Sequence, residues 1–203
     1  MVYDPLKTGY RQSAPLIFNV DFFDFASGAG LKKFYLAGLK DSVGDKYILT
    51  DDSGLIADSA NYRVQDAADI DYDIAFSNPI TIAASEATIS YTVLASSAVG
   101  RSHTVAWTVY HVAVGGAETS IGTVTDSTTQ GTAGNSCARR TVKLSLTSKR
   151  INKGEKLRIN AISTLSAAGT FLYYIDPSGL YTTGGGSQDT SRATVNIPFE
   201  VDG

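Results

Sequence analysis

The segment DIDYDI, residues 69–74, places an aspartate at every second position. Successive side chains of a β-strand point to opposite faces, so Asp69, Asp71 and Asp73 are predicted to share one face of a sheet. Three like charges at this spacing repel one another, and oxygen ligation of a hard cation would relieve the repulsion. The three residues are therefore a candidate calcium site, although the glycine and glutamate of an EF-hand loop are missing. The interpretation that we favour is a solvated strand face whose charges discourage edge-to-edge pairing.

Few residues are candidates for nucleophilic catalysis. The single cysteine, Cys137, lies in the stretch TTQGTAGNSCARR, and the two arginines that follow it favour a thiolate. We interpret Cys137 as a thiol of a loop or of the core edge. A serine or cysteine nucleophile needs a neighbouring base, and the only histidines are His103 and His111. Because His111 keeps the phase of Trp107, it is predicted to be a partly buried, hydrogen-bonded residue of a sheet.

The motifs of common enzyme and cofactor sites are missing. There is no G-x-S-x-G nucleophile elbow and no H-E-x-x-H or C-x-x-C zinc motif. The run Gly184-Gly185-Gly186 lacks the lysine of a phosphate-binding loop. We therefore predict a protein that is not an enzyme, with no catalytic residue and no bound cofactor.

Charge and targeting signals restrict the class of partner. The formal net charge of −3 and the pI of about 5.3 offer no basic surface to a nucleic-acid backbone. A single cysteine allows no internal disulfide, which fits a reducing cytoplasm or a particle assembled there. The first residues lack the pattern of a secretion signal, and no run of about 18 apolar residues predicts a membrane helix. We expect the protein to contact neither nucleic acid nor membrane.

Alternation of apolar and polar residues is the dominant pattern of the chain. It occurs in ATISYTVL (87–94), TVKLSLT (141–147), KLRINA (156–161) and ATVNIPFE (193–200). Each segment predicts a strand with one buried and one wet face, which is typical of antiparallel sheets. Pro198 falls within the last strand, and it should lie at a sheet edge or with its nitrogen facing away from the ladder.

Turn signals separate these strands. They are Gly115-Gly116, Asn152-Lys153-Gly154 and Asp176-Pro177-Ser178-Gly179. Further strands are predicted near residues 16–23, 31–37, 46–50, 70–76 and 79–84, with a short helical turn near residues 65–68. A total of roughly ten to twelve strands at this spacing favours a sandwich. We predict an all-β, antiparallel, jelly-roll-like sandwich that forms a single domain over residues 16–203, preceded by an extended arm over residues 1–15.

The predicted arm shows neither alternation nor a helical apolar face. It does contain aromatic residues and an arginine, which are enriched at interface cores, and prolines, which reduce the entropy lost on ordering. We expect the arm to lie across a neighbouring subunit through Tyr3, Pro5, Leu6, Tyr10 and Arg11.

Two segments of the second half carry a resemblance. TVKLSLTSKRINKGEKLRINAIST (141–164) resembles paired strands of jelly-roll modules in phage structural proteins and in tumour-necrosis-factor-like folds. GTFLYYIDPSGL (169–180) resembles a tail that is common in virion proteins of bacteriophages. The resemblance covers about residues 87–181. It implies a virion structural protein, such as a capsid decoration, cement or head-associated protein. Its expected partners are the major capsid protein or copies of itself in a homo-oligomer such as a trimer, and its expected location is the virion, assembled in the host cytoplasm.

Two other functions are compatible with a sandwich. A carbohydrate-binding or adhesion module, carried by a phage or a cell surface, could stack sugars on Trp107, Tyr173, Tyr174 and Tyr181, although Trp107 alternates with core positions. A β-sandwich glycosidase would need two facing carboxylates, and no such pair stands out in the sequence.

Overall fold

The computed structural model describes residues 17–18, 30–40, 46–53, 63–65, 69–97, 102–129, 134–165, 170–174 and 193–200. Every regular element in these ranges is a β-strand, which confirms the predicted all-β class. None of the described residues belongs to a helix that is long and apolar enough to cross a membrane. The predicted arm, residues 1–15, and residues 66–68 of the predicted helical turn lie outside the described residues.

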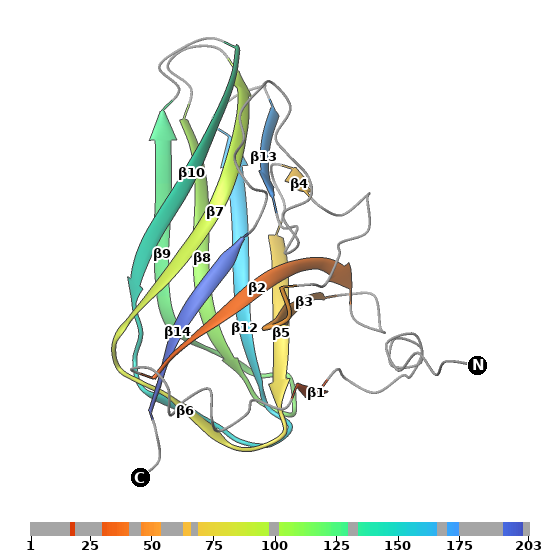
Figure 1. Ribbon diagram of the computed structural model, residues 1–203, viewed down its shortest axis with the longest axis vertical. Coiled ribbons are helices and arrows are strands. Elements are labelled where there is room, and N and C mark those ends of the chain that lie inside the picture. The colour runs from red at the N-terminus through yellow and green to blue at the C-terminus, as the bar shows by residue number, and fades with distance from the viewer. Residues whose placement is uncertain are drawn as a thin grey trace, which may run out of the picture.

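Fourteen strands follow one another along the described residues (Figure 1). In chain order they are β1 (Ile17–Phe18), β2 (Leu31–Lys40), β3 (Tyr47–Thr50), β4 (Arg63–Gln65), β5 (Asp69–Phe76), β6 (Ile80–Ile82), β7 (Glu86–Ser97), β8 (Ser102–Val112), β9 (Glu118–Thr129), β10 (Gly134–Ser145), β11 (Lys149–Ile151), β12 (Lys156–Leu165), β13 (Thr170–Tyr174) and β14 (Thr194–Glu200).

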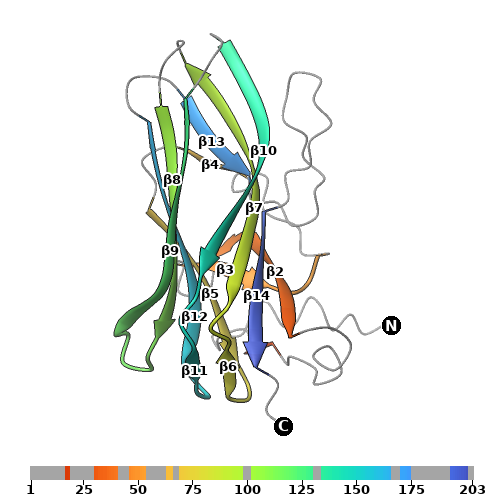
Figure 2. The ribbon, with the colours of Figure 1, turned by 90° about the vertical axis from the view of Figure 1, so that its left-hand side faces the viewer.

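The strands form two facing layers. One layer contains β9, β8, β12 and β5 as successive neighbours, and the other contains β10, β7, β14 and β2. Strand β13 pairs with β7 beyond the end of β14, and β4 pairs with β13. Strand β3 pairs with both β2 and β5 and so connects the layers. Figure 2 shows β8, β9 and β12 on one side and β10, β7 and β14 on the other.

The ladders are antiparallel with two exceptions, both at β5. Strands β1 and β3 pair with β5 in parallel. Parallel neighbours need a crossover connection rather than a tight turn, and residues 51–68 provide that connection between β3 and β5. The predicted antiparallel sandwich is thus confirmed, with parallel pairings at β5 alone among the described ladders.

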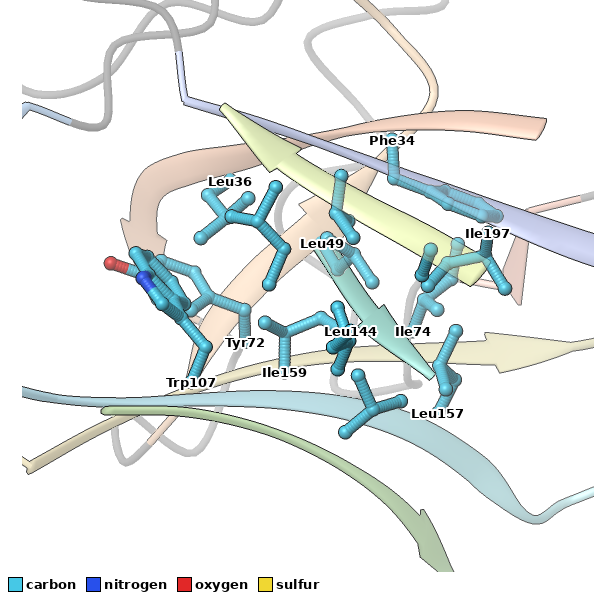
Figure 3. Packing of buried hydrophobic residues seen from close by; sticks show 14 of the residues in the cluster. Phe34, Leu36, Leu49, Tyr72, Ile74, Trp107, Leu144, Leu157, Ile159 and Ile197 are labelled. Atoms are coloured by element: carbon cyan, nitrogen blue, oxygen red, sulfur yellow. The ribbon is translucent and has the colours of Figure 1, made fainter. Parts of the chain in front are cut away.

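The inner faces of the two layers form one hydrophobic core. Along β8 buried and half-buried side chains alternate, with Trp107 fully buried at the centre. The alternating segments 87–94, 156–161 and 193–200 likewise turn their apolar residues inward, as predicted. Figure 3 shows side chains of both layers meeting in this core. Because Trp107 lies there, it is not the exposed sugar platform that a carbohydrate-binding module would need.

Two of the predicted turns are present. Gly116 has a φ of 86° and Gly154 a φ of 88°, a conformation that glycine adopts without the steric cost of a Cβ. The first turn joins β8 to β9, with a hydrogen bond from the Ala113 backbone N–H to the Ala117 carbonyl. The second joins β11 to β12. The predicted turn at residues 176–179 lies outside the described residues.

Pro198 does not lie on an edge strand, because β14 has β2 on one side and both β7 and β6 on the other. The ladder with β7 ends at Asn196, and the ladder with β6 begins at Phe199. Pro198 occupies the step between them, where a missing N–H interrupts no pairing on that side.

Candidate functional site

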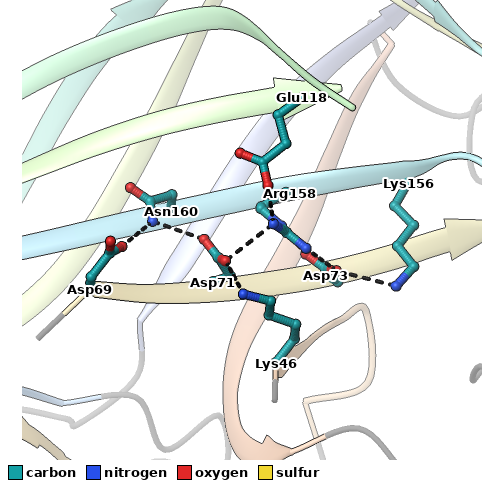
Figure 4. A network of polar contacts seen from close by, with 8 residues as sticks. All are labelled: Lys46, Asp69, Asp71, Asp73, Glu118, Lys156, Arg158 and Asn160. Carbon is teal, nitrogen blue, oxygen red and sulfur yellow. Dashed lines mark hydrogen bonds and ion pairs between the residues drawn. The ribbon is translucent and has the colours of Figure 1, made fainter. Parts of the chain in front are cut away.

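The three predicted aspartates do share one face of β5, on the outer side of the sandwich. Ile74 and Tyr72 alternate with them and are buried in the core. The neighbouring strand β12 places Asn160 opposite Asp71 and Arg158 opposite Asp73. The aspartates therefore face cationic and amide side chains from another strand (Figure 4). We call Asp69, Asp71, Asp73, Arg158 and Asn160 the carboxylate face.

Arg158 is the centre of the carboxylate face. Its Nε and Nη2 donate to Asp73 Oδ1 and Oδ2 at 2.7 and 2.8 Å. Its Nη1 lies 3.1 Å from Asp71 Oδ2 and also donates to Glu118. The Arg158 side chain is only 9% exposed, and that of Asp73 only 7%. These hydrogen bonds and the nearby negative charges raise the pKa of Arg158, so the guanidinium is a permanent cation among three carboxylates.

Asp69 and Asp71 also accept hydrogen bonds on this face. The Asn160 amide donates to Asp69 Oδ1 at 2.6 Å and to Asp71 Oδ1 at 2.8 Å. Lys46 Nζ lies 2.6 Å from Asp71 Oδ2. Burial opposes ionisation of Asp71, but the hydrogen bonds from Lys46 and Asn160 outweigh it, and the pKa of Asp71 lies below its ordinary value. The favoured interpretation of a solvated edge is thus wrong for Asp71 and Asp73, which lie in an internal strand and are ion-paired.

These contacts lead to a prediction about calcium. Protein cations and an amide already balance the aspartates, and no group of three or more His, Cys, Asp or Glu side chains in the described ranges is placed to hold a metal ion. A ligand that binds only the folded state raises the melting temperature. We expect that EDTA and added calcium both leave the melting temperature unchanged. A decrease with EDTA that calcium reverses would contradict this expectation.

A histidine–carboxylate dyad lies at the end of the sandwich where β8 and β12 meet. His111 Nε2 is 2.9 Å from Glu155 Oε2, and the His111 side chain is 9% exposed. The same Glu155 oxygen accepts hydrogen bonds from the backbone N–H and the side-chain amide of Asn152. The backbone N–H of Asn152 and then His111 hold the pKa of Glu155 below its ordinary value. The expected hydrogen bond of His111 is confirmed, and the side chain is more deeply buried than the partly buried position that was predicted.

The charge of Glu155 fixes the roles of the two imidazole nitrogens. An ionised carboxylate can only accept, so Nε2 of His111 must donate to it. In the neutral imidazole the lone pair is then on Nδ1, which is buried and has no hydrogen-bond partner among the described residues. A base held in one tautomer by a carboxylate is the arrangement of a general base and its orienting residue. The dyad therefore has two of the three elements of a nucleophilic site, and the described residues assign no nucleophile to it.

A second polar group, only part of which is buried, lies between the two layers. It comprises Tyr91 on β7, His103 on β8, Asp126 on β9 and Arg140 on β10, and we call it the seam cluster. The Tyr91 hydroxyl donates to Asp126 Oδ2 at 2.6 Å, and Arg140 Nε donates to the same oxygen at 2.8 Å. Burial, with the added effect of the Asp126 hydrogen bond, raises the pKa of Tyr91, which therefore remains a neutral donor.

Several residues singled out in the sequence cannot be assigned to these groups. The backbone of Cys137 pairs with Leu94 in the β10–β7 ladder, but its side chain lies outside the described part of the structure. The same holds for the side chains of Tyr173 and Tyr174, and all of residue Tyr181 lies outside that part. The candidate arm residues Tyr3, Pro5, Leu6, Tyr10 and Arg11 also lie outside it.

Neither the seam cluster nor the role of Glu155 was predicted from the sequence. The sequence did contain one indication of the seam cluster. By strand alternation, Asp126 lies on the same face as Val124, and Tyr91 lies on the same face as Ile89. A polar group in the buried phase of a strand needs a hydrogen-bond partner. The identity of that partner depends on which strands are neighbours across the two layers, and no local pattern specifies this.

The sequence matches no protein-family model and no curated protein. Its fold matches a CocE/NonD family hydrolase from Staphylococcus aureus with a TM-score of 0.55 at 11% identity, over 86% of this chain and 37% of that chain. It also matches an α-amino acid ester hydrolase with a TM-score of 0.53 at 10% identity, over 83% of this chain and 36% of that chain. The chain thus spans little more than a third of the length of these hydrolases, and at such identity the likeness shows the fold alone.

These neighbours contradict two predictions. The predicted virion structural function is contradicted, because the structures that the chain matches with TM-scores of 0.53–0.56 are hydrolases. The prediction that the chain is not an enzyme is contradicted by the same hydrolases. The physical reason is that alternating strands and glycine turns specify a sandwich, and one sandwich fold serves unrelated functions.

Proposed function

We propose that this β-sandwich chain itself hydrolyses ester or amide bonds. The observation that carries the proposal is the match of 83–86% of this chain to the two hydrolases described above. One of them is an α-amino acid ester hydrolase, and small amino-acid esters are accordingly the proposed substrate class.

Within this chain the His111–Glu155 dyad is the proposed acid–base group. Nδ1 of His111 would take the proton from an attacking water or hydroxyl as its oxygen bonds to the ester carbonyl carbon. The same proton would then pass to the departing alkoxide as the C–O bond breaks, which leaves the imidazole neutral again. Glu155 would hold the ring in the required tautomer and stabilise the transient imidazolium. Because Nδ1 is buried, the substrate must reach it through a local opening of the sandwich end.

The test is hydrolysis of L-alanine methyl ester by the purified full chain. An alkyl ester is preferred to a p-nitrophenyl ester, because exposed imidazoles also cleave activated esters. We expect hydrolysis above the buffer rate, with kcat/KM about 100-fold lower in His111→Gln, the loss typical of a missing general base. The matched control is Lys153→Gln, an exposed residue of the adjacent turn, which should retain full activity.

Thermal melting of each variant separates loss of activity from loss of folding. A folded wild-type chain that hydrolyses the ester no faster than buffer would overturn the proposed function. Activity that is equal in wild type and in folded His111→Gln would leave hydrolysis standing but remove the dyad from it.

A further inference from the structure

The edges of the two layers meet along a seam between β9 and β10. Within the described ladders β9 pairs with β8 and β10 pairs with β7, and no ladder joins β9 to β10. Near one end of the seam, the Thr147 backbone N–H donates to the Ile121 carbonyl at 2.8 Å, and the Thr147 hydroxyl donates to it at 3.3 Å. Further along the seam, toward the chain connection from β9 to β10, the seam cluster bridges the two strands by side chains. The sandwich is thus closed there by side chains rather than by a continuous backbone ladder.

Asp126 is the residue of the seam cluster that bridges the two layers. It lies on β9, and both of its carboxylate oxygens accept hydrogen bonds from Arg140 on β10. One of those oxygens also accepts from Tyr91 on β7, so Asp126 connects its strand to two strands of the opposite layer. The side chain of Asp126 is 10% exposed and that of Arg140 is 31% exposed. Burial opposes ionisation of Asp126, but the hydrogen bonds from Arg140 and Tyr91 outweigh it and lower its pKa.

His103 is the titratable group that lies inside this closure. It is 4% exposed and belongs to β8, the strand next to β9. The charged groups that act on it are Arg140, which disfavours its protonation, and Asp126, which favours it. Burial has the largest effect, and together with Arg140 it holds the pKa of His103 below the ordinary value of 6.5. An imidazolium at this position would stand beside the guanidinium and compete with it for the single carboxylate.

We propose that the seam cluster is an acid-sensitive latch, in which protonation of His103 weakens the Arg140–Asp126 pair and opens the β9–β10 seam while the remaining ladders stay intact. The closed state binds fewer protons than the open state because the pKa of His103 is lowered in the closed state. Its stability is therefore complete well above 6.5 and decreases as the pH falls through that value toward the pKa of the closed form. Asp126 adds its own loss only below its ordinary value of 3.8, so the two titrations are separated. The latch does not depend on the proposed hydrolysis.

The chain has a built-in reporter of this opening. Trp107 is the single tryptophan, it is fully buried, and its ring centroid lies 5.0 Å from that of Tyr91. Emission maximum and acrylamide quenching of the full chain are measured from about pH 7.5 to about pH 4.5, the range in which a histidine titrates. We expect a red shift and increased quenching below pH 6.5, the ordinary pKa of histidine, with an unchanged far-UV circular dichroism spectrum.

Variants decide whether the seam cluster causes the change. His103→Gln should abolish the fluorescence transition, and His111→Gln, which alters the other histidine, should keep it. Arg140→Gln removes the partner of Asp126 and should show the red-shifted, more quenched spectrum already at neutral pH, which also tests the latch if His103→Gln does not fold. Two wild-type results would overturn the latch: fluorescence that does not change with pH, or a fluorescence change that is accompanied by loss of the circular dichroism signal. Two variant results would also overturn it: a transition that persists in His103→Gln, or a neutral-pH spectrum of Arg140→Gln that equals that of the wild type.

Discussion

Replacing Arg158 by methionine should lower the free energy of unfolding by about 3–5 kcal/mol, the range measured when one partner of a buried ion pair is removed. Methionine preserves much of the aliphatic stem, so the change mainly removes the charge and its hydrogen bonds. Asp73 would lose two of its hydrogen-bond donors. Asp71 and Glu118 would lose the positive charge of Arg158 that compensates their carboxylates. Urea unfolding monitored by circular dichroism measures the loss.

Two controls separate buried charge from charge in general. Lys143→Gln removes the cation of an exposed pair, in which Lys143 and Glu86 side chains are 66% and 51% exposed, and it should change stability by less than about 0.5 kcal/mol. The deficit of Arg158→Met should also shrink as the pH falls below about 4, where carboxylates ordinarily become protonated. A deficit that is equal at neutral and acidic pH would mean that lost packing, rather than unpaired carboxylates, causes the destabilisation.

The behaviour of Arg158 illustrates what a single sequence can and cannot predict. Alternation in 69–74 and 156–161 identified both strands and the face on which each side chain lies, because a strand's side-chain period is a local property. The pairing of these strands is not local: Arg158 and Asp73 are 85 positions apart, and Asn160 and Asp71 are 89 apart. The sequence therefore identified the acidic face but not the residues that neutralise it.

The same division separates the two histidines. Phase along β8 was sufficient to predict that His111 is partly buried and hydrogen-bonded. Its partner Glu155 follows a turn that only the assembled β8–β12 ladder brings close. His103 shares that phase, and its environment is set by Asp126 and Arg140 on two further strands. The function could be predicted from the sequence even less well. Glycine turns and alternating strands determine the backbone fold, but they do not determine which chemical groups the faces of the sheets carry.

Three phenylalanines provide the strongest test of how the two layers are held together. Phe34 on β2, Phe76 on β5 and Phe199 on β14 meet edge to face, with ring centroids 6.1–6.4 Å apart. Phe34 is completely buried, so Phe34→Ala leaves a cavity bounded by both layers. We expect a loss of about 3–5 kcal/mol, which for a chain of this size lowers the melting temperature by roughly 6–20 °C.

The matched control lies on the same strand. Leu31 is 55% exposed, so Leu31→Ala tests the effect of a β2 substitution without a buried cavity and should cost less than about 0.5 kcal/mol. Phe76→Ala should be costly by itself, but the double variant with Phe34→Ala should lose less than the sum of the two by about 0.5–3 kcal/mol, because each ring has already lost its contact with the other. Strict additivity would show that the two layers are held independently at these positions, and a mild Phe34→Ala would place the principal contact between the layers elsewhere in the core.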